Sequence, residues 1–352
     1  MVRMVEQVMS MRGWRVKDRD RASGRHMPRR SASVLLALML ALVLASCAPS
    51  SSASDTPKGN AASLAIATWQ SSKPFDPAEG APLPTNRIVA VYGIVGGVTF
   101  NGPASNLDLL NSYLPQLQDL GNQYAKLDPT HPVKLGLDLV VNVIQPCYSF
   151  PKFCASWADD ATLQAYVDYC QKHNLLLFFD LQLGVQPVAD AVNSNLMKYL
   201  SKYSFVELAL DTEFHFPNTP QGYAMAQGYP CCLGWMDATE INWTIDTLAN
   251  ISLQNHLPRK VLVIHQWNYA VLTNKNKIKL NPDVSIVLQS DGFGATSDKL
   301  FDYQVFVQKA MIQYGGYKLF FQYPGAGAGD NPLQTPAQVM QVYPQPLFIS
   351  YE

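Results

Sequence analysis

Residues 175–214 read LLLFFDLQLGVQPVADAVNSNLMKYLSKYSFVELALDTEF, and this stretch decides the fold. It begins with a nearly continuous apolar run at 175–184 and ends with another at 206–214. Runs of this length and composition are typical of strands that are buried on both faces, as in a parallel sheet. Residues 188–203 between them carry apolar side chains at helical spacing. The stretch therefore predicts a strand, a helix and a second, parallel strand.

The same alternation continues on both sides of this unit. Six further predicted strands lie at 87–93, 133–141, 260–267, 284–292, 317–324 and 346–352. Four further helical patterns lie at 105–127, 159–173, 237–255 and 297–314, and Asp159 and Asp237 stand at N-cap positions. Eight strands alternating with helices predict an α/β fold, a single (β/α)8 TIM barrel. Because residues 268–282 lack a clear helical pattern, a doubly wound open sheet is the alternative.

The N-terminal region combines positive charge with a short apolar run. Nine Lys/Arg residues lie in the first thirty positions, and the apolar run SASVLLALMLALVLAS (31–46) precedes Cys47. An apolar run too short to span a bilayer well, between charged residues and a small-residue cleavage site, is typical of an export signal. The ending LASC (44–47) resembles the bacterial lipobox, which implies diacylation of Cys47 and stable anchoring. Met27 is an alternative start, because MPRR before the apolar run gives a normal signal length.

Three segments follow from these patterns. We expect a signal peptide at 1–46, a lipidated flexible tether at 47–84 and the barrel domain at 85–352. The tether is rich in Ser, Ala, Pro and Gly, a composition that cannot bury a core. Beyond residue 30 the chain holds 17 Lys/Arg against 24 Asp/Glu. This acidic balance, without a basic patch, argues against a nucleic-acid partner. The expected location is extracytoplasmic, with the N-terminal lipid in the cell membrane.

Cysteine use is consistent with export. Cys147 and Cys154 bracket a short loop, and an oxidising compartment favours a disulfide between them. No cysteine spacing matches a zinc site, and no His-x-His occurs on the first strand, so we expect neither a metal nor a cofactor. The pairing of the remaining cysteines beyond the tether stays open: Cys170, Cys231 and Cys232.

Polar side chains gather toward the ends of the predicted strands. In a (β/α)8 barrel, the carboxyl ends of the strands and the loops after them form the mouth of the active site. Residues two apart on a strand share a face. Three pairs therefore point together: Asp180 with Gln182, Asp211 with Glu213, and Gln289 with Asp291. The candidate catalytic residues are Glu213, Asp211, Asp180 and Asp291. The candidate substrate-binding residues are Tyr92, Gln182, His265, Gln266, Trp267, Gln289 and Tyr323.

A cluster of carboxylates at a barrel mouth favours glycoside hydrolysis. Burial and like charge raise some carboxyl pKa values and leave other carboxylates ionised. Glycoside hydrolysis needs such a pair, with one protonated acid and one ionised base, nucleophile or stabiliser. Aromatic side chains at strand ends suit stacking against sugar rings: Phe214, Trp267 and Tyr323. The expected partner is a glycan, and the alternative is a non-catalytic carbohydrate-binding or envelope-scaffolding lipoprotein.

The segment LALDTE (208–213) resembles the fourth-strand Asp-x-Glu motif of glycoside hydrolase barrels, notably family-25 muramidases and less closely family-18 chitinases. The resemblance implies that Glu213 is the general acid. Two positions where the chitinase motif has further Asp residues hold Val206 and Ala209, and the first strand lacks the Asp of muramidases. More broadly, residues 87–352 look like an uncharacterised family of secreted bacterial lipoproteins with such a barrel. The matching features are a Tyr-Gly first strand, Asp180-Leu181-Gln182, Asp211-x-Glu213, His265-Gln266, Asp291-Gly292-Phe293-Gly294 and Lys318-Leu319-Phe320.

Two finer expectations concern how the carboxylates act. An ionised Asp211 beneath Glu213 would raise the pKa of Glu213 and keep it protonated. We favour Asp180 over Asp291 as the second catalytic carboxylate, because the third strand is the direct neighbour of the fourth. Lys318 follows a predicted strand start, so we expect it to bond a carboxylate at the base of the barrel.

Overall fold

Eight parallel strands close into a barrel, as the sequence predicted. The computed structural model describes residues 74–95, 102–149, 152–228, 232–310, 312–322 and 329–352. The barrel strands are β1 (Arg87–Ile94), β2 (Val133–Ile144), β4 (Leu176–Leu181), β5 (Val206–Leu210), β7 (Lys260–Gln266), β9 (Val284–Ser290), β10 (Tyr314–Leu319) and β11 (Phe348–Tyr351). Each pairs in parallel with the next, and β1 pairs with both β2 and β11. This closure excludes the open sheet.

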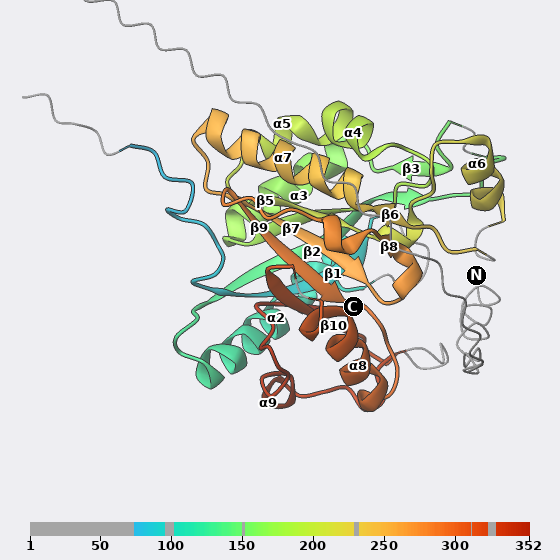
Figure 1. Ribbon diagram of the computed structural model, residues 1–352. Coiled ribbons are helices and arrows are strands. Elements are labelled where there is room, and N and C mark those ends of the chain that lie inside the picture. Colours follow the sequence, from blue (N-terminus) through green and yellow to red (C-terminus); the bar gives the residue numbers. More distant parts are fainter. Residues whose placement is uncertain (1–73, 96–101, 150–151, 229–231, 311, 323–328) are drawn as a thin grey trace, which may run out of the picture. The chain divides into compact units, whose positions relative to one another are not determined.

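Helices connect most of the strands (Figure 1). The helical segments are α2 (Leu107–Leu127), α3 (Asp160–His173), α4 (Val188–Ala191), η1 (Val192–Leu196), α5 (Met197–Leu200), η2 (Thr212–Phe214), α6 (Pro220–Gln227), α7 (Ala238–Asn255), η3 (Tyr269–Val271), η4 (Lys275–Lys277), α8 (Thr296–Asp302), η5 (Tyr303–Gln308) and α9 (Pro336–Val339). Three short strands complete the elements: β3 (Ala155–Trp157), β6 (Met236–Asp237) and β8 (Leu272–Thr273). Asp159 and Asp237 cap α3 and α7 through side-chain bonds to backbone N–H groups, as predicted.

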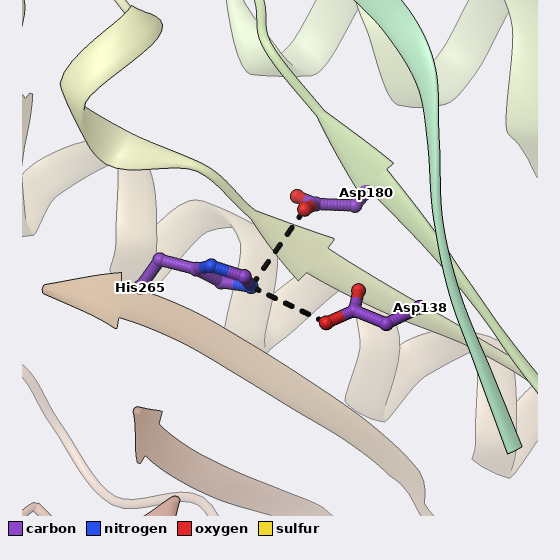
Figure 2. Close-up of side chains that lie close together, drawn as sticks. All are labelled: Asp138, Asp180 and His265. Carbon is purple, nitrogen blue, oxygen red and sulfur yellow. Dashed lines mark ion pairs between the residues drawn. The ribbon is translucent and has the colours of Figure 1, made fainter. Parts of the chain in front are cut away.

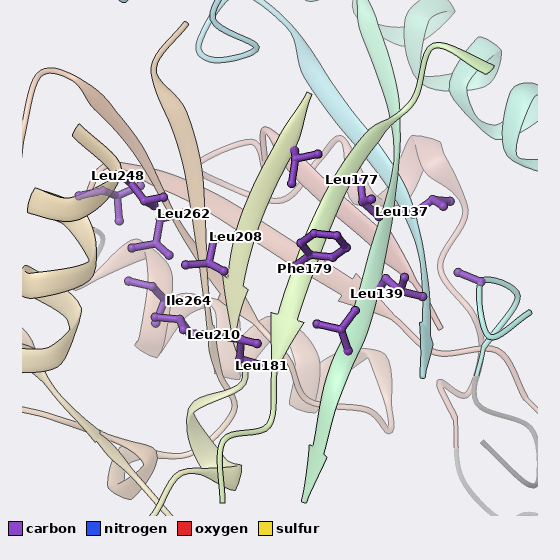
Figure 3. Packing of buried hydrophobic residues seen from close by; sticks show 14 of the residues in the cluster. Leu137, Leu139, Leu177, Phe179, Leu181, Leu208, Leu210, Leu248, Leu262 and Ile264 are labelled. Atoms are coloured by element: carbon purple, nitrogen blue, oxygen red, sulfur yellow. The ribbon is translucent and has the colours of Figure 1, made fainter. Parts of the chain in front are cut away.

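The strands are apolar on both faces because each face has its own core. Their outward side chains and those of the helices form the larger core, part of which Figure 3 shows. On β4, Phe179 and Leu181 belong to this outer core, whereas Phe178 belongs to a smaller core inside the barrel. The inner core also contains Ile88 and Ala209. This alternation along the strands leaves the next inward positions, toward the carboxyl ends, for polar residues.

Several predicted boundaries were wrong. The helix expected to reach 314 ends earlier, and β10 begins at Tyr314 rather than at Tyr317. The strand was missed there because it contains Gly315 and Gly316, which strands normally disfavour. Close packing explains the glycines, since a Cβ on Gly315 would lie 2.2 Å from the Tyr303 hydroxyl oxygen. Also, β5 ends at Leu210 and passes into the turn η2, so the fourth strand does not extend to 214.

Two other segments support the barrel. Residues 75–84, which we expected to belong to the tether, pack on it: Leu83 is fully buried in the inner core, and Arg259 N–H donates to the Pro77 carbonyl. Cys147 and Cys154 form the predicted disulfide, with Cα atoms 4.2 Å apart.

The signal peptide, Met27, Cys47, Cys231 and Tyr323 lie outside the described residues. Among the helices that are described, none has the length and apolarity needed to cross a bilayer.

Candidate active site

A cavity of about 190 Å³ opens at the carboxyl ends of the strands. Four carboxyl groups and one ammonium line it, from Asp211, Glu213, Asp291, Glu352 and Lys318. The other described residues of its wall are Tyr92, Ile94, Gln182, Phe214, Trp267, Phe293 and Phe320. Five of these are aromatic, so an apolar wall surrounds a floor of charged groups.

Glu213 reaches the cavity through a turn rather than through the strand. The strand pleat ends with Leu210, and η2 then carries Glu213 above Asp211. The Thr212 hydroxyl donates to the His265 carbonyl over 2.7 Å, which fixes the turn to β7. The Trp267 indole N–H donates to Oε2 of Glu213. Asp211 and Glu213 therefore share the cavity as predicted, although not because they share a strand face.

Burial, with a further contribution from Asp291, raises the pKa of Glu213 to about 7. The Trp267 bond acts in the opposite direction, because it stabilises the carboxylate. The expectation that an ionised Asp211 causes the rise was wrong. Burial and Asp180 raise the pKa of Asp211 itself well above its usual range. Asp211 instead accepts a 3.1 Å hydrogen bond from the Gln182 side chain.

Asp291, directly after β9, is a carboxylate of the cavity that its neighbours hold in the ionised form. Burial alone would raise its pKa, but Lys318 and His265 lower it below the usual value. The Lys318 ammonium lies 3.3 Å from Oδ1 of Asp291, and Nδ1 of His265 lies 2.8 Å from Oδ2. Lys318 also pairs with Glu352 over 2.9 Å and lies 3.7 Å from the centre of the Tyr92 ring. Both oxygens of Asp291 are thus held in place by cations.

A second charged group lies in the barrel interior around His265. Its Nε2 faces Oδ2 of Asp138, 3.8 Å away, and Oδ2 of Asp180, 3.7 Å away (Figure 2). All three side chains are buried, and neither carboxylate lines the cavity. Burial, followed by Asp180, raises the pKa of Asp138 to about 7. Although burial acts against it, Asp180 and Asp291 raise the pKa of His265 to about 10.

The candidate substrate-binding residues divide into two groups. Tyr92, Gln182 and Trp267 line the cavity. Gln266 lies apart from it, because its side chain bonds Lys275 and the Asn268 carbonyl. The remaining candidates within the described residues lie beneath it in the interior: His265 and Gln289, whose amide donates to the Ser350 hydroxyl.

Sequence reasoning misplaced or missed several cavity residues. Lys318 lies near the end of β10, at the mouth and not at the base, because β10 begins three residues earlier than predicted. Glu352 was visible as an acid after the last strand, the same signal that identified Asp291. Phe293 and Phe320 follow strand ends by a few residues, and their place on the wall had no comparable signal.

Comparison of the chain with protein-family models, with curated proteins and with solved structures found no significant match. The fold and its buried acidic residues are compatible with a glycosidase-like enzyme.

Proposed function

We propose that this chain is a cell-surface glycoside hydrolase that acts on an envelope or exported glycan. In this proposal Glu213 is the general acid, and Asp291 is the base or nucleophile. One observation carries it: a single cavity contains one carboxyl group with a pKa near 7 and one carboxylate held ionised by cations. That division of protonation states is what acid/base cleavage of a glycosidic bond requires.

The hydrogen-bond partners of the two groups suit these roles. Trp267 fixes the direction of Glu213, whose pKa of about 7 leaves it largely protonated in mildly acidic solution. A general acid works best when its pKa lies near the working pH. Lys318 and His265 orient Asp291 and compensate its charge. Asp291 is therefore available as the negative group beside a developing oxocarbenium ion.

Asp291 replaces Asp180 as the preferred partner of Glu213. Asp180 is fully buried in the barrel interior, and it does not line the cavity. Asp291 lines the cavity together with Glu213 and raises its pKa electrostatically. A catalytic carboxylate must reach the sugar or the attacking water, so access decides between the two.

The shape of the cavity supports a sugar ligand. Its aromatic wall offers apolar faces, and Gln182 and Tyr92 add polar groups beside the carboxylates. Ligand sites usually combine an apolar lining with a few convergent polar groups. The volume of about 190 Å³ is below the roughly 300–1,000 Å³ of sites for drug-sized ligands. We therefore expect it to enclose one sugar ring, with the rest of the glycan outside.

The direct test is hydrolysis of a glycan panel. We expect the full-length chain, purified in detergent, to release new reducing ends from at least one envelope polysaccharide. Glu213→Gln should lose about 10²–10⁴ in rate while glycan binding changes only a few-fold. Glu240→Gln is the matched control, because Glu240 pairs with His215 outside the cavity. Equal rates for Glu213→Gln and wild type would refute the assignment.

The alternative is a carbohydrate-binding lipoprotein without catalysis. It is favoured by the engagement of both Asp291 oxygens with cations, which a purely structural ion pair also shows. The same panel separates the two functions. Binding of a glycan by wild type, with no reducing ends released over a range of pH values, would establish the alternative.

We propose further that a diacylglycerol on Cys47 attaches the chain to the cell membrane. The lipobox-like ending at 44–47 supports this. Mass spectrometry of the mature N-terminus should find the lipid, and Cys47→Ser should leave an unacylated precursor. An unmodified Cys47 in the wild-type protein would contradict the anchor without affecting the assignment of the cavity.

A further inference from the structure

The side chains of Asp138, Asp180 and His265 come from β2, β4 and β7 and meet beneath the cavity. We propose that these three residues form a binding site for one divalent transition-metal ion, such as Zn²⁺ or Mn²⁺. The site goes beyond the proposed hydrolase function and does not depend on it. No local sequence motif predicts this metal site, because its donor residues are separated by tens of residues in the sequence.

The spacing of the donor atoms matches metal coordination better than hydrogen bonding. Nε2 of His265 lies 3.8 Å from Asp138 Oδ2 and 3.7 Å from Asp180 Oδ2. Both distances exceed the upper limit of about 3.2 Å for an N–H···O hydrogen bond. For metal–ligand bonds of about 2.0–2.2 Å, tetrahedral donors stand about 3.3–3.6 Å apart. All three donor atoms lie within 4.8 Å of one another, so a contraction of the group would let them fill three of the four tetrahedral positions.

The donors also lack other partners. Among the described residues, no hydrogen bond reaches Nε2 of His265 or either carboxylate oxygen of Asp138. No side chain donates a hydrogen bond to Asp180, and its one backbone contact is with Leu181. The two aspartates are fully buried, and His265 is 1 % exposed. Burying charged groups without hydrogen bonds costs several kcal/mol per ion unless they are paired or coordinate a metal. A divalent cation would displace the proton from Nε2 of His265 into solvent, balance the two carboxylates and engage all three side chains at once.

The surroundings of His265 have the arrangement of a metal ligand. Its Nδ1 lies 2.8 Å from Asp291 Oδ2. Histidine ligands usually donate their second ring N–H to a carboxylate, which fixes the tautomer and turns the other nitrogen toward the metal. Here that bond leaves Nε2 facing Asp138 and Asp180 (Figure 2). Asp291 would thus act as the positioning residue of the metal site.

The buried group borders the cavity through His265. His265 also belongs to a second group of close donor atoms, which it shares with Asp211 and Asp291. Both of these carboxylates line the cavity, so this is the side from which we expect an ion to enter. Imidazole with carboxylates suits first-row transition metals, whereas calcium prefers six to eight oxygen donors.

The test measures metal binding rather than activity. The full-length chain, untagged and in detergent, is stripped with EDTA, incubated with ZnCl₂ or MnCl₂ alone and passed through gel filtration. Mass spectrometry of the elements should find one ion per chain, and calorimetry should give the affinity. We also expect the thermal unfolding midpoint to rise with the retained ion, because ligands of the folded state stabilise it.

Matched variants locate the ion. Asp180→Asn and Asp138→Asn should each weaken binding at least about 100-fold, and Asp291→Asn about 10–100-fold, as expected for a residue that orients a ligand. Glu207→Gln is the control, because Glu207 is equally buried but lies at the start of β5. Circular dichroism verifies that each variant is folded, and two separate aspartate variants guard against one that is not.

Two results would overturn the proposal. If the wild-type protein retains neither Zn²⁺ nor Mn²⁺ after gel filtration, the three side chains are stabilised by shared protons and not by a metal ion. Equal retention by wild type and a folded Asp180→Asn or Asp138→Asn would place the ion elsewhere. Neither result bears on glycan cleavage, so the failure of this site and the failure of the hydrolase are distinguishable.

Discussion

The two ends of the barrel handle buried charge differently. At the amino ends of the strands, each of two fully buried cations has its own acid: Arg87 lies 3.0 Å from Asp128, and Lys260 neighbours Glu207. Backbone groups complete these pairs, since Lys260 donates to two carbonyls and Glu207 accepts from Val261 N–H. Toward the carboxyl ends, in the cavity and in the interior beneath it, Lys318 and His265 face a larger group of acids in the described structure: Asp138, Asp180, Asp211, Glu213, Asp291 and Glu352.

The difference shows that a shifted pKa alone does not mark an active site. Burial raises the pKa of Glu207 to about 7, the same value as for Glu213. Glu207, however, is fully enclosed and bonds the backbone of β7, whereas Glu213 lines the cavity. The mouth differs from the base in two respects: it has more acids than cations, and some of those acids line a cavity. Replacing acids at each end, and measuring both activity and stability, therefore tests the comparison.

The largest expected effect comes from Asp291→Asn at the mouth. Loss of the charge removes the base or nucleophile, so kcat/KM on the confirmed glycan should fall by about 10²–10⁴. Asp168→Asn, an exposed position on α3, serves as the control. If Asp180→Asn were inactive while Asp291→Asn kept full activity, the catalytic role would return to Asp180.

Asp128→Asn at the base should affect stability instead of catalysis. It leaves the buried guanidinium of Arg87 without its acid, which should lower the free energy of unfolding by about 2–3 kcal/mol. Hydrogen bonds from Thr130 and His131, together with Arg87, hold the pKa of Asp128 well below its usual range. Its contribution should therefore be present above about pH 4 and be lost as the pH falls.

Chemical denaturation measures this change, and kcat/KM of the folded variant should stay near that of wild type. An Asp128→Asn protein with normal stability but lost activity would contradict the division between the two ends.

The pH profile sharpens the comparison at the mouth itself. Glu213 must be protonated to act as the acid, so kcat/KM should fall about tenfold per pH unit above its pKa of about 7. Asp291 must be ionised, and its pKa is lowered, so the acidic decline should lie below about pH 4. An alkaline decline already complete at pH 5 would mean that Glu213 has an ordinary pKa.

The smallest expected effect is that of Trp267→Phe. The indole N–H lowers the pKa of Glu213 by stabilising its carboxylate. Its removal should raise that pKa and move the alkaline decline to higher pH, with a few-fold loss of kcat from poorer orientation. Movement to lower pH would show that Trp267 does not act on Glu213 in this way.

The sequence predicted the elements better than the contacts between them. Apolar runs identified all eight strands, and the side chains of Asp159 and Asp237 identified two helix starts. Strand-end position also selected Asp211, Glu213 and Asp291, which do line the cavity.

The sequence did not predict how deep each polar side chain lies along the barrel axis. Asp138 and Asp180 are inward-facing like Asp211, but β2 continues to Ile144, and the stagger of the strands leaves both acids below the cavity. Lys318 was placed at the wrong end because two glycines concealed the start of its strand. Register and stagger depend on pairing between distant segments, which no local pattern contains.

Closure of the ring makes the finished site a late product of folding. Ile88 of the first strand pairs with Phe348 of β11, so the ring cannot close until nearly all of the described chain has been synthesised. Glu352 follows the same strand and supplies the second acid of Lys318. Until then β1 and β10 each lack a neighbour, and unpaired strand edges attract other chains. Such distant pairings form slowly. A nascent chain therefore carries every upstream carboxylate of the mouth, but not the arrangement that would let them act together.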